Sequence, residues 1–385
     1  MKVFKLIIRN AMRHRLRTFL TVLGLALAVM AFGLIRTLVD AWYAGARIAP
    51  PDRLVTRHAV SFTFTLPLAY LEQIQKIDGV SAVTPAVWFG GIYIDPKNFF
   101  GNFAVDPVTY LDMYKEIIVQ PEELKEVLAD RRGAIVGRRL ADRFGWKVGD
   151  KVPLIGTIYP GNWEFTIRAI YHGRDKDTDE TAFLFRFDYL DEVMRETAPG
   201  RAGQAGWFGV KINDANRAAE IGAAIDSRFK NSWAETKTET EKEFVLGFIQ
   251  MADVLIAGLR IISYLIIGVI LLVLVNTMVM TARERISENA FLRVLGFRNF
   301  HLIGLILGES LAMACAGGIA GMGLLAMTSR LVGQALSIYL PGYYVGLETY
   351  VIVVAAAVIV GCLASIFPIQ RAVSIKIIDG LRVVD

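Results

Sequence analysis

The chain alternates between long apolar runs and a mixed, more polar region. The apolar runs occupy residues 18–39, 254–280, 300–328 and 350–367. A helix of about 20 mostly apolar residues is long enough to cross a bilayer. The pattern therefore predicts four transmembrane helices, with Pro368 ending the fourth and a short outer loop over residues 329–349.

Residues 40–253 have the composition of a soluble domain, in which short β-like runs alternate with helical ones. This pattern predicts an α+β domain inserted between the first two membrane helices. Strands are expected at residues 80–94, with interruptions at Pro85 and Gly90-Gly91, and at 134–136, 152–155, 164–171, 183–187 and 208–212. Helices are expected at residues 67–76, 121–130, 138–144, 188–196 and 216–229. Residues 232–253 are rich in helix formers, which predicts a helical stalk running unbroken into the second membrane helix.

A charged segment follows the second apolar run, over residues 281–299. Ile286, Ala290, Val294 and Phe297 are spaced for one face of a helix. The charged side chains lie mainly off that face: Arg283, Glu284, Arg285, Glu288 and Arg293. A membrane helix that continues into such a segment can carry motion to something docked beneath it, so these residues form a predicted coupling segment.

The placement of Lys and Arg predicts the orientation in the membrane. Residues 1–17 contain six bases and no acid, and they read as an amphipathic helix on the membrane surface. A mitochondrial presequence is the alternative, but the apolar run that follows argues against it. Residues 281–299 hold four bases, the tail after residue 367 holds three, and the outer loop holds one. Both termini are therefore expected in the cytoplasm, with the large domain in the periplasm and the helices in the inner membrane.

The sequence favours no catalytic chemistry in this chain. No phosphate-binding P-loop motif occurs, and the four histidines are scattered. Asp175, Asp177 and Asp179 resemble the start of a calcium loop, but Glu180 and Arg186 stand where such a loop has Gly and Glu. We expect no catalytic residue, no metal site, no cofactor in this chain and no nucleic-acid partner.

Small and polar residues in the membrane helices are candidates for packing or hinge roles. They are Gly304, Gly308, Gly317 and Gly321, with Glu309 and Asn276. Glycines one turn apart let helices approach closely in lipid. Asn276 could bond across helices. Glu309 is either hydrogen-bonded to a neighbouring helix near the inner interface or a hinge or subunit-contact residue.

Two segments resemble one family of permeases. Glu284-Arg285-x2-Glu288-Asn289-Ala290-x-Leu292-Arg293-x2-Gly296 resembles the ER-x2-EIG-x-LR-x2-G segment of FtsX-like permeases, the family of MacB and of the lipoprotein-releasing LolC and LolE. Pro368-x2-Arg371-Ala372 with Leu381-Arg382 is similar to the family's tail. Asn289-Ala290 replaces the usual Ile-Gly, and Lys376-Ile377 replaces the common Asp-Pro. In the polar region, residues 134–150 look like the family's strand, helix and Gly-Asp turn.

The resemblance implies a non-catalytic permease subunit of an ABC transporter of the mechanotransmission type, working in export or in lipoprotein or lipid release. A separate ABC ATPase would bind ATP and Mg, and the ATPase-coupling residues would be Arg283, Glu284, Arg285, Glu288, Ala290, Leu292, Arg293 and Gly296. The resemblance also implies a second permease copy or a related paralogue, a periplasmic adaptor or acceptor protein, and contact with membrane lipid.

A second reading stays open at this point. The chain could be an FtsX-like scaffold or signalling subunit that regulates an extracytoplasmic partner instead of transporting a substrate. An intramembrane enzyme is a third class of function. The sequence shows no nucleophile–base pair and no metal cluster that would support it.

Overall fold

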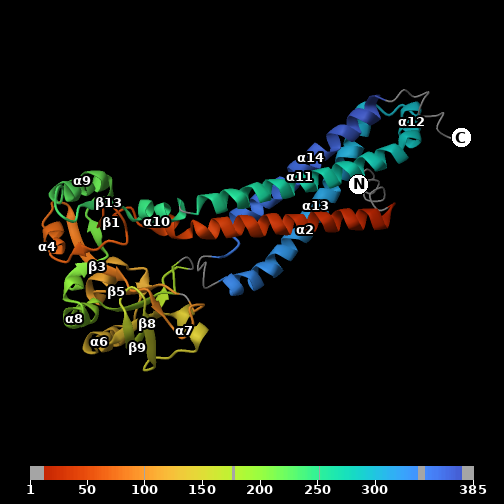
Figure 1. The fold of residues 1–385 in the computed structure, drawn as a ribbon. Helices are drawn as coiled ribbons and strands as arrows, with labels where there is room; N and C mark the ends of the chain where they lie inside the picture. Colours follow the sequence, from red (N-terminus) through yellow and green to blue (C-terminus); the bar gives the residue numbers. More distant parts are fainter. Residues whose placement is uncertain (1–12, 99, 176–177, 251, 337–342, 375–385) are drawn as a thin grey trace. The chain divides into compact units, whose positions relative to one another are not determined.

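A computed structural model describes residues 13–98, 100–175, 178–250, 252–336 and 343–374. The first part of the expected amphipathic helix, Phe99, and the tail residues from Lys376 to Arg382 lie outside the described residues. The chain divides into two compact units, one built mainly from the long helices and the other from residues 42–250 (Figure 1).

Within the residues that the structure describes, the membrane unit contains four helices that are long and apolar enough to cross a bilayer, as predicted. They are α2 (Arg15–Trp42), α11 (Asp253–Glu284), α13 (Asn299–Leu336) and α14 (Leu347–Ser374). A short helix, α12 (Ile286–Val294), connects α11 and α13. Figure 1 shows α11, α13 and α14 with α12 at one end of this unit.

The expected end of the fourth membrane helix at Pro368 is wrong. α14 continues through Pro368 to Ser374, and the proline ring is buried within the unit. A proline inside a helix removes one backbone hydrogen bond, but helices packed in a membrane tolerate it where neighbouring groups compensate. The helix therefore extends beyond the apolar run that predicted it. The outer loop is likewise shorter than expected, because α13 reaches Leu336.

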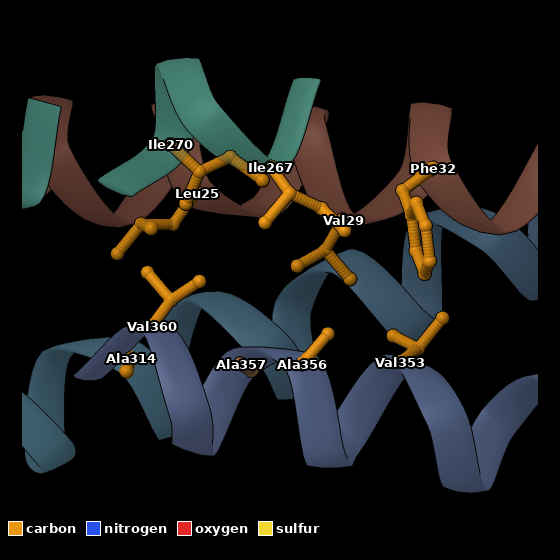
Figure 2. Close-up of a pocket in the computed structure, with 10 residues that line it drawn as sticks. All are labelled: Leu25, Val29, Phe32, Ile267, Ile270, Ala314, Val353, Ala356, Ala357 and Val360. Atoms are coloured by element: carbon orange, nitrogen blue, oxygen red, sulfur yellow. The ribbon is translucent and has the colours of Figure 1, made fainter. Parts of the chain in front are cut away.

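Apolar side chains from all four membrane helices meet at one place (Figure 2). Leu25 and Val29 of α2 face Ile267 of α11, and Val360 of α14 lies beside Ala314 of α13. The space between them is about 20 Å³, enough for roughly one water, but no polar side chain lines it. Such a void stays dry, so the helices are held there by van der Waals packing alone.

Among the described residues, the second unit is an α+β domain built on an eleven-stranded sheet. Along the main path, the strand order is β13-β1-β12-β3-β5-β10-β7-β9-β8-β4, and β6 pairs with β9. The strands are β1 (Arg53–His58), β3 (Val80–Trp88), β4 (Gly91–Ile92), β5 (Asn102–Val105), β6 (Ile117–Ile118), β7 (Gly133–Gly137), β8 (Lys151–Gly156), β9 (Gly161–Gly173), β10 (Phe183–Arg186), β12 (Trp207–Ile212) and β13 (Thr236–Thr240). A separate pair joins β2 (Leu66–Pro67) and β11 (Gln204–Ala205).

The unit also contains short helices. They are α3 (Ala44–Ile48), α4 (Tyr70–Gln75), α5 (Pro107–Met113), α6 (Pro121–Ala129), α7 (Arg138–Phe144), α8 (Phe187–Thr197), α9 (Ala218–Arg228) and α10 (Glu241–Gln250). Of these, α3 precedes the first strand and α10 follows the last. The strand β7 and the helix α7 match the expectation, and α7 ends at Gly145. Gly145 has φ of +68°, the left-handed conformation in which glycine ends helices.

Pro85 lies inside β3 and does not interrupt it as expected. Ala86 accepts a hydrogen bond from the Gly206 N–H over 2.9 Å, so the backbone groups of Ala86 point toward β12. Those of Pro85 must point to the opposite neighbour, β5, because these directions alternate along a strand. β5 ends at Val105, which pairs with Ala86. The missing N–H of Pro85 therefore falls where no strand needs it.

The expected unbroken stalk over residues 232–253 is also wrong in part. Residues 236–240 form β13, which pairs with β1, and α10 begins only at Glu241. Thr240 and Glu243 form a capping box: the Thr240 N–H donates to the Glu243 carboxylate over 3.0 Å, and the Glu243 N–H donates to the Thr240 hydroxyl over 3.2 Å. The helix formers in this stretch were overridden by pairing with a strand almost 200 residues earlier.

A buried arginine fixes the start of α10. Arg53 of β1 forms ion pairs with Glu241, the first residue of α10, and with Glu116, at 2.8 Å for the latter. Its guanidinium also lies 4.0 Å from the centre of the Tyr114 ring. Burial alone would lower the pKa of Arg53, but hydrogen bonds to Glu116 and Glu241 outweigh burial and raise it. The α10 helix is thus attached to the sheet by a charge that cannot be neutralised near pH 7.

A single buried side chain holds the β4–β5 connection, and this generates a stability prediction. The Asn102 amide accepts from the Gly91 N–H over 2.7 Å and donates to the carbonyls of Gly91 and Phe100. Asn102→Ala should leave these buried groups unpaired and lower the free energy of unfolding of the domain by about 3 kcal/mol. Urea unfolding followed by tryptophan fluorescence measures it. The exposed Asn162→Ala is the control, and equal losses in both variants would contradict the prediction.

Candidate coupling site

A tight turn ends α12 and directs the chain into α13. Gly296 has φ of +88°, a left-handed conformation that glycine adopts without steric cost. Its N–H donates to the Arg293 carbonyl over 3.0 Å. The Phe297 N–H donates to the Leu292 carbonyl over 3.1 Å. These two bonds form the Schellman arrangement, so Gly296 of the predicted segment fixes where α12 stops.

Arg285 joins α12 to α13. It lies between the end of α11 and the start of α12, and its Nη1 donates to Glu309 Oε2 over 2.9 Å. Its Nε donates to Glu288 Oε2 over 3.1 Å. The Glu309 side chain is only 7% exposed, and such a carboxylate in an apolar helix requires a positive partner. Glu309 is therefore bonded to the connection between α11 and α12.

Glu284 and Glu288 bind the start of α2. Arg17 donates two hydrogen bonds to the Glu284 carboxylate, at 2.8 and 2.7 Å, in a bidentate pair. Arg13, two residues before α2 begins, pairs with Glu288 through a single hydrogen bond from its Nη1 to Glu288 Oε1. The hydrogen bond from Arg13 lowers the pKa of Glu288, so this carboxylate is ionised at neutral pH. His14 adds a further contact to Glu284 at 3.4 Å.

Arg293 joins α12 to α14. Its Nη2 donates to the carbonyls of Ala372 and Val373, at 2.9 and 2.8 Å. The last carbonyls of a helix lack partners within that helix, and a cation placed there satisfies them and balances the helix dipole. Contacts from the segment Glu284–Arg293 therefore reach all three other membrane helices, α2, α13 and α14.

The outward surface of α12 differs from the expected apolar face. Ala290 is buried, whereas Val294 and Phe297 are exposed. Phe291 and Leu295, which the expectation omitted, are 58% and 60% exposed. Ala290 faces inward because the charged contacts above rotate its side of α12 toward the bundle. The exposed apolar surface of this segment consists of Phe291, Val294, Leu295 and Phe297, and Arg283 is exposed nearby.

Two of the candidate glycines in α13 let α2 approach closely. A Cβ at Gly317 would lie 2.5 Å from Leu25 Cβ, and one at Gly321 would lie 2.7 Å from the Ala26 carbonyl oxygen. Gly304 has open space beside it. Gly308 is half-buried.

The side chain of Asn276 is exposed. Its neighbour Thr277 makes the contact between helices instead, with Thr21 of α2 at 3.2 Å.

Sequence reasoning missed Arg13, Arg17, Thr21 and the exposed Phe291 and Leu295. A usable signal was present for the first two. Arg13 and Arg17 are four residues apart, and so are Glu284 and Glu288, which places each pair on one helical face. Two matched faces of opposite charge indicate contact between the helices that carry them.

The four membrane helices, the inserted α+β domain and the charged connection after the second helix define an integral membrane protein of the permease class. A family described as "MacB-like periplasmic core domain" matches residues 18–228, and one described as "FtsX-like permease C-terminal" matches residues 260–377. The chain belongs to the FtsX/MacB type of ABC transporter permeases. Membership implies an ABC ATPase as partner and often dimerisation, and members are generally non-catalytic.

Two curated relatives extend over nearly the whole chain. The uncharacterized ABC transporter permease MJ1507 of Methanocaldococcus jannaschii is 22% identical and covers 97% of this chain and 96% of its own length. The pyoverdine export ATP-binding/permease protein PvdT of Pseudomonas fluorescens is 23% identical over 96% of this chain, which spans 57% of that protein. Among solved structures, the extracellular domain of the noncanonic ABC-type transporter YknZ from Gram-positive bacteria has a TM-score of 0.36 and 13% identity, covering 49% of this chain and 98% of that one.

The Arg285–Glu309 pair generates a prediction about the stability of the membrane unit. Arg285→Met should destabilise the unit by about 3 kcal/mol, because it leaves Glu309 buried without its partner. Adding Glu309→Gln should recover most of that loss, since both charges are then gone. Thermal unfolding of the detergent-solubilised chain measures both variants. Arg283→Met is the exposed control, and a double variant less stable than Arg285→Met alone would contradict the pairing.

Proposed function

We propose that this chain is the permease subunit that transmits the ATP-driven motion of a separate ABC ATPase to its own extracytoplasmic domain. One observation carries the proposal. The charges of the segment Glu284–Arg293 bond to the other membrane helices. Phe291 and Val294 of α12, and Leu295 directly after it, remain exposed. A helix held in this way passes a displacement on to α2, α13 and α14 together.

The exposed apolar surface of α12 is the proposed docking site for the ATPase. Exposed apolar patches outside a membrane span mark interaction sites, and aromatic side chains in such patches contribute much of the binding energy. The sequence carries no P-loop of its own, so ATP and Mg are assigned to the partner. The exposed Arg283 in the last turn of α11 would pair with a carboxylate of that partner. Glu284, Arg285 and Glu288 form contacts within this chain.

The proposal places α12 and both termini in the cytoplasm of a cell with its permease in the inner membrane. The distribution of Lys and Arg supports this orientation. The name of the relative PvdT, a pyoverdine export protein, supports outward export in preference to lipoprotein release. Two permease copies, or this chain with a paralogue, would complete the transporter, and an adaptor protein would receive the cargo.

Charge introduced on the docking surface should remove the ATPase without unfolding the permease. We expect Phe291→Asp with Leu295→Asp to lower co-purification of the ATPase by at least about tenfold, since each buried aromatic or aliphatic anchor contributes roughly 1–2 kcal/mol. Quantitative mass spectrometry of the tagged permease drawn from its native membrane measures the ratio. Val148→Asp, an exposed apolar position in the extracytoplasmic domain, is the control. Undiminished ATPase in the double variant, with unchanged thermal stability, would refute this docking surface.

The orientation has its own test. Cys315 and Cys362 are first replaced by Ala, and single cysteines are then placed at Arg283 and at Val148. In intact cells a membrane-impermeant maleimide should label the cysteine at 148 and leave that at 283 unlabelled until the cells are lysed. Labelling of position 283 in intact cells would reverse the proposed orientation and remove the ATPase from this end of the chain.

A further inference from the structure

A hollow of about 710 Å³ opens in the extracytoplasmic domain. Its walls come from α4 and the residues before it, from β3, and from the starts of α5 and α8. Sites for small organic ligands commonly have volumes of about 300–1,000 Å³ with a mostly apolar lining. The hollow has the size of such a site, and none of the coupling contacts described above involves it.

The hollow exists because β5 ends at Val105. Beyond Val105 the chain turns away through Pro107 into α5, so β3 loses its neighbour on that side. Val83 and Pro85 are two residues apart on β3, and their side chains therefore point to the same face, where both line the hollow. The proline that the sheet tolerates at this point forms part of the floor.

The floor of the hollow is apolar, and apolar side chains at its rim are exposed to solvent. Val83 and Phe187 are buried beneath the space. Val108 and Leu128 line the same space but are 54% and 40% exposed. A ligand with a hydrophobic body would remove these two side chains from water, at a gain of about 25 cal/mol for each Å² covered.

Negative charge exceeds positive charge in the lining. Three carboxylates contribute, from Glu72, Asp106 and Asp188, against the single guanidinium of Arg186. Asp188 already holds that guanidinium through a hydrogen bond of 2.9 Å, and Arg186 also donates to the Leu128 carbonyl. The hydrogen bond to Asp188, with a further contribution from the charge of Asp106, raises the pKa of Arg186. Asp188 therefore neutralises the guanidinium of Arg186. The lining retains the negative charges of Glu72 and of Asp106, whose Oδ1 also accepts from the Val108 N–H at the start of α5.

We propose that this hollow is a binding site for an apolar organic cation. The hydrophobic body would lie on the floor formed by Val83 and Pro85, and the positive charge would face Glu72 and Asp106. An anion of the same shape would be repelled by the net negative charge of the lining, so the sign of the ligand's charge decides selectivity. The binding requires no ATPase, and it therefore stands or falls separately from the proposed coupling.

A matched pair of ions tests the proposal directly. Tetraphenylphosphonium and tetraphenylborate have nearly the same size and shape and carry opposite charges. Equilibrium dialysis with the full chain in nanodiscs, corrected for uptake by empty nanodiscs, should show saturable binding of the phosphonium and at least about tenfold weaker binding of the borate. Saturable binding of the borate at equal affinity would overturn the assignment.

Variants locate the site. Ala69→Trp, at an exposed position on the wall of the hollow, should abolish phosphonium binding by filling the space. Glu72→Lys should weaken it by about fivefold, corresponding to roughly 1 kcal/mol. Glu196→Lys, an exposed reversal on α8 outside the lining, should leave it unchanged. Unchanged binding in Ala69→Trp, with the domain still folded by circular dichroism, would place any binding elsewhere and refute this site.

Discussion

A carboxylate inside an apolar membrane helix must be matched by a positive charge, and Glu309 imposes this constraint on the whole membrane unit. Arg285 supplies this positive charge. Because Arg285 sits where α11 ends, its position sets the direction in which α12 leaves the bundle. Glu288 then bonds to the same guanidinium and to Arg13, and Glu284 bonds to Arg17. One buried charge therefore organises a chain of contacts that reaches α2 and α13 and leaves the apolar side of α12 uncovered.

The extracytoplasmic domain also contains a buried charge that is balanced by arginine–carboxylate ion pairs. Arg53 is buried in the sheet and bonds to Glu116 and Glu241, as Arg285 bonds to Glu288 and Glu309. In both units a guanidinium with two carboxylates fixes a short helix, α10 in one and α12 in the other. Arginine suits this role because its planar fork donates in several directions and keeps its charge when buried. Both helices flank α11 along the chain.

The sequence predicted the four membrane helices and the α+β character of the inserted domain, because a bilayer demands long apolar helices and the alternation of short elements is local information. Its motif also singled out the charged connection between α11 and α13, for which ATPase coupling is the proposed role. It could not assign β13, since pairing with β1 depends on residues far away in the chain. The predicted interruption at Pro85 was wrong for the same reason, because whether a proline breaks a strand depends on where the neighbouring strand ends. The inward position of the Ala290 side chain could not be predicted from the sequence, because it depends on ion pairs between helices and not on the helical periodicity.

The direct passage from β13 into α10 decides how the domain withstands mechanical load. β13 pairs antiparallel with β1 over five residues, from Thr236 to Thr240, and α10 starts at the very next residue. The hydrogen bonds between β13 and β1 run across the strands, so a pull directed along β13 would load all of them together in shear instead of breaking them one after another as in unzipping. The edge strand β13 would then hold the start of α10 on the sheet against a pull in that direction.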